Sequence, residues 1–357
     1  MAREATTPNK RPIGLALTAA ALFGLSTPAA KWLLAATDPW VLAGFLYLSS
    51  GIGLAILWLI GRALGGVPRE APLRRRDVPW LAGAVVSGGV IGPVLLMFGL
   101  AAGSASGTAL LLNLEGVLTA GLAWAIFREH FDARIAAGMG LITAGAIVLA
   151  WPSGEALSAN RSVLLVAGAC LAWAVDNNLT RRVSGGDPVL ITALKGGAAG
   201  AVNLAIAAAM GAPLPRPASA LGAAVVGLLG YGISLVLFVR ALRDLGAART
   251  GAYFSTAPFI GAAASVAALG EPLTARLAAG GALMGLGVWL HISERHVHDH
   301  VHEALGHEHL HRHDEHHHHK HEADAPAGEP HSHHHVHVPL GHAHPHYPDL
   351  HHRHRHP

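Results

Sequence analysis

Residues 129–138 read EHFDARIAAG, and residues 271–280 read EPLTARLAAG. Both stretches follow the pattern E-x-x-x-A-R-x-A-A-G, and they lie 142 residues apart. The same offset aligns Gly145 with Gly287. A shared pattern at a constant offset indicates that the chain consists of two related halves, each carrying this motif near its end.

The composition is that of a membrane protein. Of the 357 residues, 52% are hydrophobic and only 13% are charged, whereas a soluble domain carries about a quarter charged residues. Apolar runs of about 20 residues recur, each long enough to cross the hydrocarbon layer. Backbone groups in lipid must be satisfied internally, so these runs should be helices. We therefore predict an all-α membrane protein with ten transmembrane helices, at residues 13–36, 39–61, 79–101, 104–127, 133–151, 162–183, 188–211, 219–240, 247–269 and 273–292.

Each half contains five of these spans, an odd number, so the two halves must have opposite orientations in the membrane. Inverted repeats of this kind are common among transporters, whose solute site lies near the midplane between the halves. The predicted organisation is a cytoplasmic N-terminus (1–12), a first five-helix repeat (13–151), a second five-helix repeat (162–292) and a C-terminal tail (293–357).

Orientation follows from the basic residues in the loops. Lysine and arginine gather in alternate loops, including Arg74 to Arg76 and Arg181 with Arg182, while the opposite side holds one arginine per loop. Cytoplasmic loops carry this excess, so both termini should be cytoplasmic in a multi-pass protein of the plasma (inner) membrane. The net charge of +3 is thus a topology signal, and we expect no nucleic acid partner.

Several motifs resemble those of a known family. They are Phe23-Gly24 with Lys31 in the first span, Asp38-Pro39 opening the second, Ser104-Ala105-Ser106 opening the fourth, and Gly-Glu-Pro-Leu-Thr at 270–274. With their order and duplication, the chain resembles the EamA-type ten-helix proteins of the drug/metabolite transporter superfamily over roughly residues 13–292. The resemblance implies transport, often export, of small metabolites such as amino acids.

The chain departs from the family pattern in both halves. Pro258 matches a proline that the family often has in the fourth span of a half, but the first half has Gly116 there, beside Glu115. The family often has an arginine in the second span, where this chain has Leu46 in the first half and Lys195 in the second.

Four ionisable residues fall well inside predicted spans: Lys31, Glu115, Asp176 and Lys195. Inserting each such side chain into the membrane costs roughly 3 kcal/mol. Asp176 and Lys195 lie at matched depth on consecutive helices and are expected to be able to pair. Burial favours the neutral form of a carboxylic acid, which suits reversible protonation. Glu115 and Asp176 are therefore candidates for proton or cation coupling, and structural ion pairs are the alternative. The candidate transport-pathway residues are Lys31, Asn113, Glu115, Asp176, Asn177, Lys195 and Pro258.

The repeated motif itself has a structural explanation. Glu129 and Glu271 stand at corners, where a carboxylate stabilises a helix N-terminus. Each is followed five residues later by an arginine, Arg134 or Arg276, at the start of the next span. We expect these residues to pin the corners of the fold, with a direct role in transport as the alternative.

Histidine is concentrated in the tail. Of 27 histidines, 26 lie between residues 291 and 357, including His316, His317, His318, His319, His333, His334 and His335. The tail has few large apolar residues, so we predict disorder. Imidazole-rich tracts bind Ni, Zn, Co or Cu, so the tail is expected to bind divalent metal ions, although transport itself requires no cofactor.

Three functions fit these features. The first is a secondary active transporter, an exporter of a small organic metabolite, working by alternating access with proton coupling and a metal-binding tail that regulates or buffers. The second is a Ni, Co or Zn transporter, and the third is a membrane metal sensor that transports nothing. No enzyme motif occurs, so we predict no enzymatic activity. The expected partners are the lipid bilayer and a small solute, and a homodimer is an open option.

Overall fold

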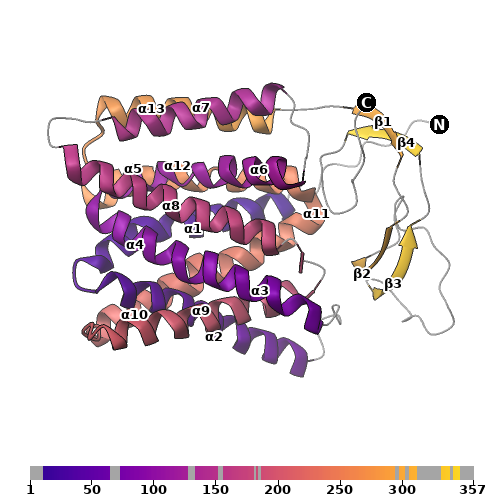
Figure 1. Cartoon of the computed structure of the whole chain (residues 1–357), viewed down its shortest axis with the longest axis horizontal. Helices are drawn as coiled ribbons and strands as arrows, with labels where there is room; N and C mark the ends of the chain where they lie inside the picture. Colours follow the sequence, from indigo (N-terminus) through magenta and orange to yellow (C-terminus); the bar gives the residue numbers. More distant parts are fainter. Residues whose placement is uncertain are drawn as a thin grey trace.

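The computed structural model describes residues 11–64, 73–127, 133–151, 156–180, 182–183, 186–293, 297–301, 305–311, 331–337 and 341–345. Residues 11–293 of this set form a helical bundle (Figure 1). In this described part, eight helical segments are long and apolar enough to cross a membrane. The shorter apolar helices α12 (Ala257–Leu269) and α13 (Ala275–Ile292) complete the predicted ten, so the ten-helix membrane architecture is confirmed.

The first half begins with two uninterrupted spans, and its third and fourth spans each consist of several segments. Asp38 caps the second span by accepting the backbone N–H groups of Trp40 and Val41, with Pro39 as the first helical residue. The elements are α1 (Arg11–Leu34), α2 (Pro39–Ala63), the 3-10 turn η1 (Arg75–Asp77), α3 (Val78–Ala84), the π-helical segment η2 (Val85–Ile91), α4 (Gly92–Ala102), α5 (Ala105–Leu111), α6 (Leu114–Phe127) and α7 (Ala133–Ala150).

The second half repeats this plan. Asp187 caps the helix that begins with Pro188, as Asp38 does in the first half. The elements are α8 (Ala156–Thr180), α9 (Pro188–Ala209), α10 (Pro217–Val226), the π-helical segment η3 (Gly227–Ile233), α11 (Ser234–Phe254), α12 and α13.

Irregularities recur at the repeat offset. The π-helical segments η2 and η3 begin at Val85 and Gly227, which are 142 residues apart. The fourth span of each half is interrupted by a short turn, at residues 112–113 and at 255–256. Neither feature is visible in hydropathy, and both recur because the two halves share one backbone plan.

Equivalent helices of the two halves pack antiparallel. In the pair α7 and α13, Gly145 approaches Gly280 and Met284, while Gly138 approaches Gly287. The contact therefore runs down one helix and up the other, which is the arrangement expected of inverted repeats. Figure 1 shows α7 and α13 side by side along one edge of the bundle, with α2, α9 and α10 at the opposite edge.

Glycine also joins α2 to α9. A side chain at Gly51 would collide with the backbone of Gly197, and one at Gly200 with that of Leu48. Small residues permit the close backbone approach on which helix association in lipid depends. Because α2 belongs to the first half and α9 to the second, this contact joins the two repeats.

One predicted loop was wrong. The span predicted at 104–127 is present as one apolar span, with a short turn at residues 112–113 between α5 and α6. The loop predicted between 240 and 247 is instead helical, because α11 continues to Phe254. Alanine, leucine and arginine dominate residues 241–249 and favour helix. The break comes instead just before α12, where Pro258 removes a backbone donor but is tolerated in the first helical turn.

The tail contains short strands where disorder was predicted. Strand β1 (Val297–Val301) pairs antiparallel with β4 (Gly341–Pro345), and β2 (Leu305–His311) pairs antiparallel with β3 (His331–His337). Extended backbones can pair through their own N–H and C=O groups whatever the side chains, so a polar composition did not exclude strands. Two-stranded ladders of this kind are marginally stable in water.

Candidate functional site

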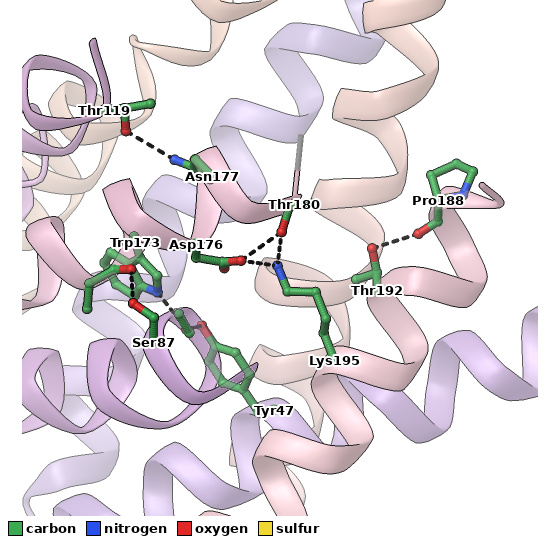
Figure 2. A network of polar contacts seen from close by, with 12 residues as sticks. Tyr47, Ser87, Thr119, Trp173, Asp176, Asn177, Thr180, Pro188, Thr192 and Lys195 are labelled. Atoms are coloured by element: carbon green, nitrogen blue, oxygen red, sulfur yellow. Dashed lines mark hydrogen bonds and ion pairs between the residues drawn. The ribbon is translucent and has the colours of Figure 1, made fainter. Parts of the chain in front are cut away.

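The central polar contact joins α8 to α9. Lys195 Nζ lies 2.6 Å from Asp176 Oδ1 and donates to Thr180 Oγ1 at 3.0 Å (Figure 2). Thr180 in turn donates to Asp176 Oδ1 at 2.8 Å, because the two residues are one helical turn apart. Asp176 is only 8% exposed. The structure thus contains the ion pair that the matched depth of these residues suggested.

Glu115 approaches this pair from the first half of the chain. Asn177 Nδ2 donates to Glu115 Oε1 at 2.9 Å and to Thr119 Oγ1 at 3.3 Å, and Figure 2 shows the second of these bonds. Glu115 is also near enough to Asp176 for their charges to interact. The ion pairs between described residues do not include Glu115. Its carboxylate therefore has an amide partner in this part of the chain, whereas Asp176 has a cation.

The π-helical segment η2 brings backbone carbonyls to the same region. The Gly88 carbonyl accepts hydrogen bonds from Tyr47 Oη at 3.1 Å and from Trp173 Nε1 at 2.9 Å. A π-helix shifts the backbone hydrogen-bond pattern, and such segments are frequent at functional sites. A Cβ atom at Gly88 would collide with the Asp176 side chain. Glycine is therefore required here for the close approach of η2 to α8.

Aromatic side chains from both halves form a cluster that begins at Tyr47. The ring centroids of Tyr47 and Tyr231 are 5.5 Å apart, and those of Tyr231 and Phe23 are 5.9 Å apart. Phe254 lies 5.4 Å from Phe23. Because Tyr47 and Phe23 belong to the first half and Tyr231 and Phe254 to the second, the cluster crosses the interface between the repeats.

Lys31 and Glu271 lie together at a different place, the corner between α4 and α5. Lys31 Nζ donates to the carbonyls of Leu100 and Gly103, both at 2.7 Å, at the end of α4. The Glu271 carboxylate accepts the N–H groups of Ala105 at 2.6 Å and Ser106 at 2.8 Å, at the start of α5. A cation at a helix C-terminus and an anion at an N-terminus are both stabilising. Glu271 thus binds the N-terminus of α5 in the first half and not that of the helix that follows it in the chain, while Glu129 lies outside the described residues.

The remaining candidates occupy structural positions near the repeat interface. Asn113 stands in the break of the fourth span and donates to the Leu110 carbonyl at 2.9 Å. Pro258 is buried in the first turn of α12, after the equivalent break. Arg134, the second residue of α7, donates to Ser293 Oγ at 3.0 Å, and Arg276 is the second residue of α13. Of the seven pathway candidates, the structure gathers Glu115, Asp176, Asn177 and Lys195 into one network.

The metal-binding prediction concerns residues of the tail. His316 to His319 lie outside the described residues, and His333 to His335 lie on β3, opposite residues 307–309 of β2. Within the part of the chain that the structure describes, no group of three or more His, Cys, Asp and Glu side chains is arranged to hold a metal ion.

Tyr47 and Phe23 were missed as site residues from the sequence. The chain has only four tyrosines, and a tyrosine in an apolar span needs a partner for its hydroxyl group. That rule draws attention to Tyr47. Its partner could not be found from the sequence, because the Gly88 carbonyl accepts the Tyr47 hydrogen bond from within a π-helical segment that no sequence pattern indicated.

Comparison with known proteins agrees with this architecture. The model of the EamA-like transporter family matches residues 10–151 and again residues 160–293. The chain belongs to the EamA-like transporter family. It is a member of the drug/metabolite transporter superfamily, a multi-pass membrane transporter with two EamA domains, and not an enzyme.

Two individual proteins are similar to this chain, one in sequence and one in fold. An uncharacterized transporter of Methanothermobacter thermautotrophicus is 29% identical over 288 residues, which are 77% of this chain and 84% of that protein. One protein of known crystal structure has the same fold, with a TM-score of 0.58 and 21% identity over 79% of this chain and 98% of the other.

Proposed function

We propose that this EamA protein is a secondary active transporter that exports a small organic metabolite by alternating access. One observation carries the proposal: Glu115 of the first half and Asp176, Asn177 and Lys195 of the second half form one network where the inverted repeats meet. Charged side chains inside a membrane protein mark solute or ion pathways. Rocking of one repeat against the other would expose such a network first to one side and then to the other.

The carboxylates of the network supply the coupling. A proton that binds Glu115 or Asp176 on one side of the membrane and leaves on the other drives solute movement in the opposite direction. Lys195 keeps Asp176 compensated while no solute is bound, and Lys31 serves the α4–α5 corner rather than the pathway. Both termini lie in the cytoplasm, and the protein resides in the plasma membrane.

The tail adds a metal-dependent activity. We propose that its histidines bind Ni, Zn, Co or Cu at the cytoplasmic face and buffer the ion or regulate transport. The concentration of 26 of the 27 histidines in residues 291–357 also favours a second candidate function, export of a divalent metal ion by the bundle itself. Against it, the described part of the bundle lacks a cluster of three metal-ligating side chains.

One experiment separates these functions. Full-length protein and a variant ending at Ser293, which keeps the contact of Arg134 with Ser293, are reconstituted in liposomes that contain amino acids, amines and organic acids together with Ni, Co and Zn. Efflux of each compound is measured by mass spectrometry, with and without a pH gradient. Empty liposomes give the background, and Asp77→Asn, which removes a carboxylate outside the network, is the matched control variant.

The expected result is pH-gradient-dependent efflux of an organic solute by both forms, lost in Glu115→Gln and in Asp176→Asn. Metal efflux by the shortened form, lost in the same two variants, would establish the metal transporter instead. If no compound leaves faster than from empty liposomes, the protein is not the transporter proposed here, and sensing of metal by the tail is then the better explanation.

A further inference from the structure

The register of strands β2 and β3 places histidine positions together on one face of their ladder. His307 stands opposite His335, and His309 stands opposite His333. Residues that are directly opposite in an antiparallel ladder share a face, and so do residues two apart in one strand. One face, which we call the histidine face, therefore contains positions Leu305, His307, His309, His311, His331, His333, His335 and His337.

The opposite face of the same ladder has a different composition. It contains positions Gly306, Glu308, Leu310, Ser332, His334 and Val336. Seven of the eight positions on the histidine face are histidine, whereas His334 is the one histidine among these six. The strand register thus sorts the histidines by face, which their abundance in the sequence does not reveal.

The second ladder of the tail repeats this arrangement. His298 of β1 stands opposite His344 of β4, and His300 stands opposite His342. Both pairs share a face, because residues two apart in a strand lie on the same side. The other face of this ladder contains positions Val297, Asp299, Val301, Gly341, Ala343 and Pro345. Two ladders of different sequence therefore both place histidine opposite histidine.

Two neighbouring histidine pairs supply the ligand number of a metal site. Directly opposite Cβ atoms in an antiparallel ladder are about 4.5–5.5 Å apart. Zn takes four ligands in a tetrahedron, with imidazole nitrogens at about 2.0–2.1 Å, and imidazole also suits Ni. Among the described residues there is no preformed group of three metal-ligating side chains, so binding of an ion has to bring the imidazoles together.

We propose that one Zn or Ni ion binds four residues of the histidine face and locks β2 to β3. The four ligands are His307, His309, His333 and His335. They form the two inner pairs, whereas His311 and His331 form the last pair of the ladder. The proposal rests on the proposed function of the tail and names its ligands. A two-stranded ladder is marginally stable in water, and metal binding adds its free energy to folding when the ligands meet only in the folded state.

The alternative is local binding within one strand. Histidines two residues apart, such as His298 and His300, recur throughout the tail, and a single such pair can bind an ion. The two kinds of site respond differently to the loss of one histidine. In local binding the other pairs remain, so the tightest affinity stays the same. In the ladder site all four histidines bind the same ion, so the loss of any one of them weakens it.

Exchanges that keep the composition test the site in full-length protein in detergent. Ser332→His/His333→Ser moves one histidine from the histidine face to the opposite face, and His309→Leu/Leu310→His does the same in the other strand. Zn affinity is measured by competition with a chelating dye. We expect each exchange to weaken the tightest Zn site by about tenfold or more, since even the loss of a residue that only supports a metal ligand costs about 10–100-fold.

A third exchange is the matched control. His334→Val/Val336→His moves a histidine along β3 but leaves it on the opposite face, so it should not change the tightest affinity. All three variants keep the 27 histidines of the chain, and the thermal midpoint of the bundle without Zn should be the same in each. Equal Zn affinity in the control and in both test exchanges would rule out the ladder site.

The distance between the strands gives a second readout, which local binding would not change. Leu310 and Ser332 are directly opposite on the face without the proposed ligands. Spin labels are attached to Leu310→Cys/Ser332→Cys in a Cys170→Ala background, which removes the natural cysteine. We expect Zn to shorten the distance between the labels, as measured by electron paramagnetic resonance. Tight Zn binding that leaves this distance unchanged would overturn the proposal.

The ladder site and the metal-binding function of the tail fail in different ways. If full-length protein binds Zn more tightly than the variant ending at Ser293, but neither test exchange weakens that binding, the tail binds metal and the ladder site is wrong. If the two forms bind Zn equally, both proposals for the tail are wrong. The transport function is decided separately, by the liposome assay.

Discussion

At the scale of single residues, the membrane part of this transporter contains polar groups in two distinct situations. Some are compensated by an opposite charge, as Asp176 is by Lys195. Others are buried with no hydrogen-bond partner in the described structure, as are the hydroxyl groups of Thr108 and Thr250. The physical consequences are opposite, because removing one member of a buried pair is costly, whereas removing an unsatisfied group is not.

The buried Asp176–Lys195 pair predicts that the stability losses from substituting its two members are not additive. Among the described residues, Lys195→Met leaves the buried Asp176 with Thr180 as its hydrogen-bond partner, so we expect a loss of about 3–5 kcal/mol in the free energy of unfolding. The double variant Asp176→Asn/Lys195→Met should lose clearly less than the sum of the two single variants. Unfolding in mixed micelles measures both, and additive losses would show that the pair contributes nothing specific.

The two unsatisfied threonines predict an increase in stability. Thr108 and Thr250 occupy equivalent positions of the repeat and are 2% and 0% exposed. Valine has nearly the same shape without the hydroxyl group, so Thr108→Val and Thr250→Val should each raise the free energy of unfolding by about 1 kcal/mol. Thr143→Val is the control, because that exposed hydroxyl already donates to the Met139 carbonyl at 2.8 Å, and a similar gain there would contradict the explanation.

At the scale of elements, glycine decides how closely the helices approach. The π-helical segment η2 reaches α8 at Gly88, and α7 reaches α13 at Gly145 and Gly287. These contacts have different consequences. The first brings η2 against the Asp176 side chain of the polar network, while the second joins the last helices of the two repeats.

Substitution at Gly88 tests how η2 positions the network. In Gly88→Ala the new methyl group collides with the Asp176 side chain, so we expect a loss of about 1–3 kcal/mol in stability and reduced transport in the liposome assay. Gly116→Ala on α6 is the matched control, because nothing lies within 4 Å of a Cβ atom there. Alanine should stabilise that helix by about 0.5–1 kcal/mol. Equal behaviour of the two variants would show that the close approach at Gly88 is unimportant.

The α7–α13 contact predicts that equivalent substitutions in the two helices lower the thermal midpoint by similar amounts. A Cβ atom at Gly145 would lie 2.7 Å from the Gly280 carbonyl oxygen, and one at Gly287 would lie 2.6 Å from that of Gly138. Gly145→Leu and Gly287→Leu should therefore each lower the thermal midpoint, by a similar amount. Gly140→Leu on the same helix meets open space and should leave the midpoint nearly unchanged. A large effect of Gly145→Leu without one of Gly287→Leu would contradict the symmetric contact.

At the scale of the whole molecule, the transporter combines two inverted repeats with a tail of different chemistry. The family match extends over residues 10–151 and 160–293 and does not include the tail. The repeats meet through antiparallel pairs of equivalent helices, α2 with α9 and α7 with α13. In the proposed mechanism, one repeat moves against the other while the polar network stays between them.

Removal of residues 294–357 tests whether the tail is independent of the bundle. The full-length protein should bind Ni and Zn in a calorimetric titration. The shortened protein keeps only His130 and His291 of the 27 histidines, so it should lose that binding. Its thermal midpoint without metal should remain unchanged, because α13 and Ser293 are intact. A lower midpoint would show that the tail stabilises the bundle.

The sequence by itself determined the environment of each segment. Long apolar runs predicted the helices, the repeated motif predicted two halves, and charges inside those runs picked out Glu115, Asp176 and Lys195. The predictions of helices and of two halves were confirmed, because hydropathy and repeated motifs can be read from the chain without knowing which partner a residue meets. The transport role of the three charged residues stays a prediction.

Only the tertiary structure decided which residues meet. It assigned Lys31 and Glu271 to the α4–α5 corner, brought Tyr47 to the carbonyl of Gly88, and placed Tyr231 beside Tyr47 across the repeat interface. Those contacts depend on the rotation of each helix, on π-helical segments and on glycines whose neighbours are far away in the chain. Nearly every side of a membrane helix is apolar, so the sequence pattern does not reveal which side faces a partner.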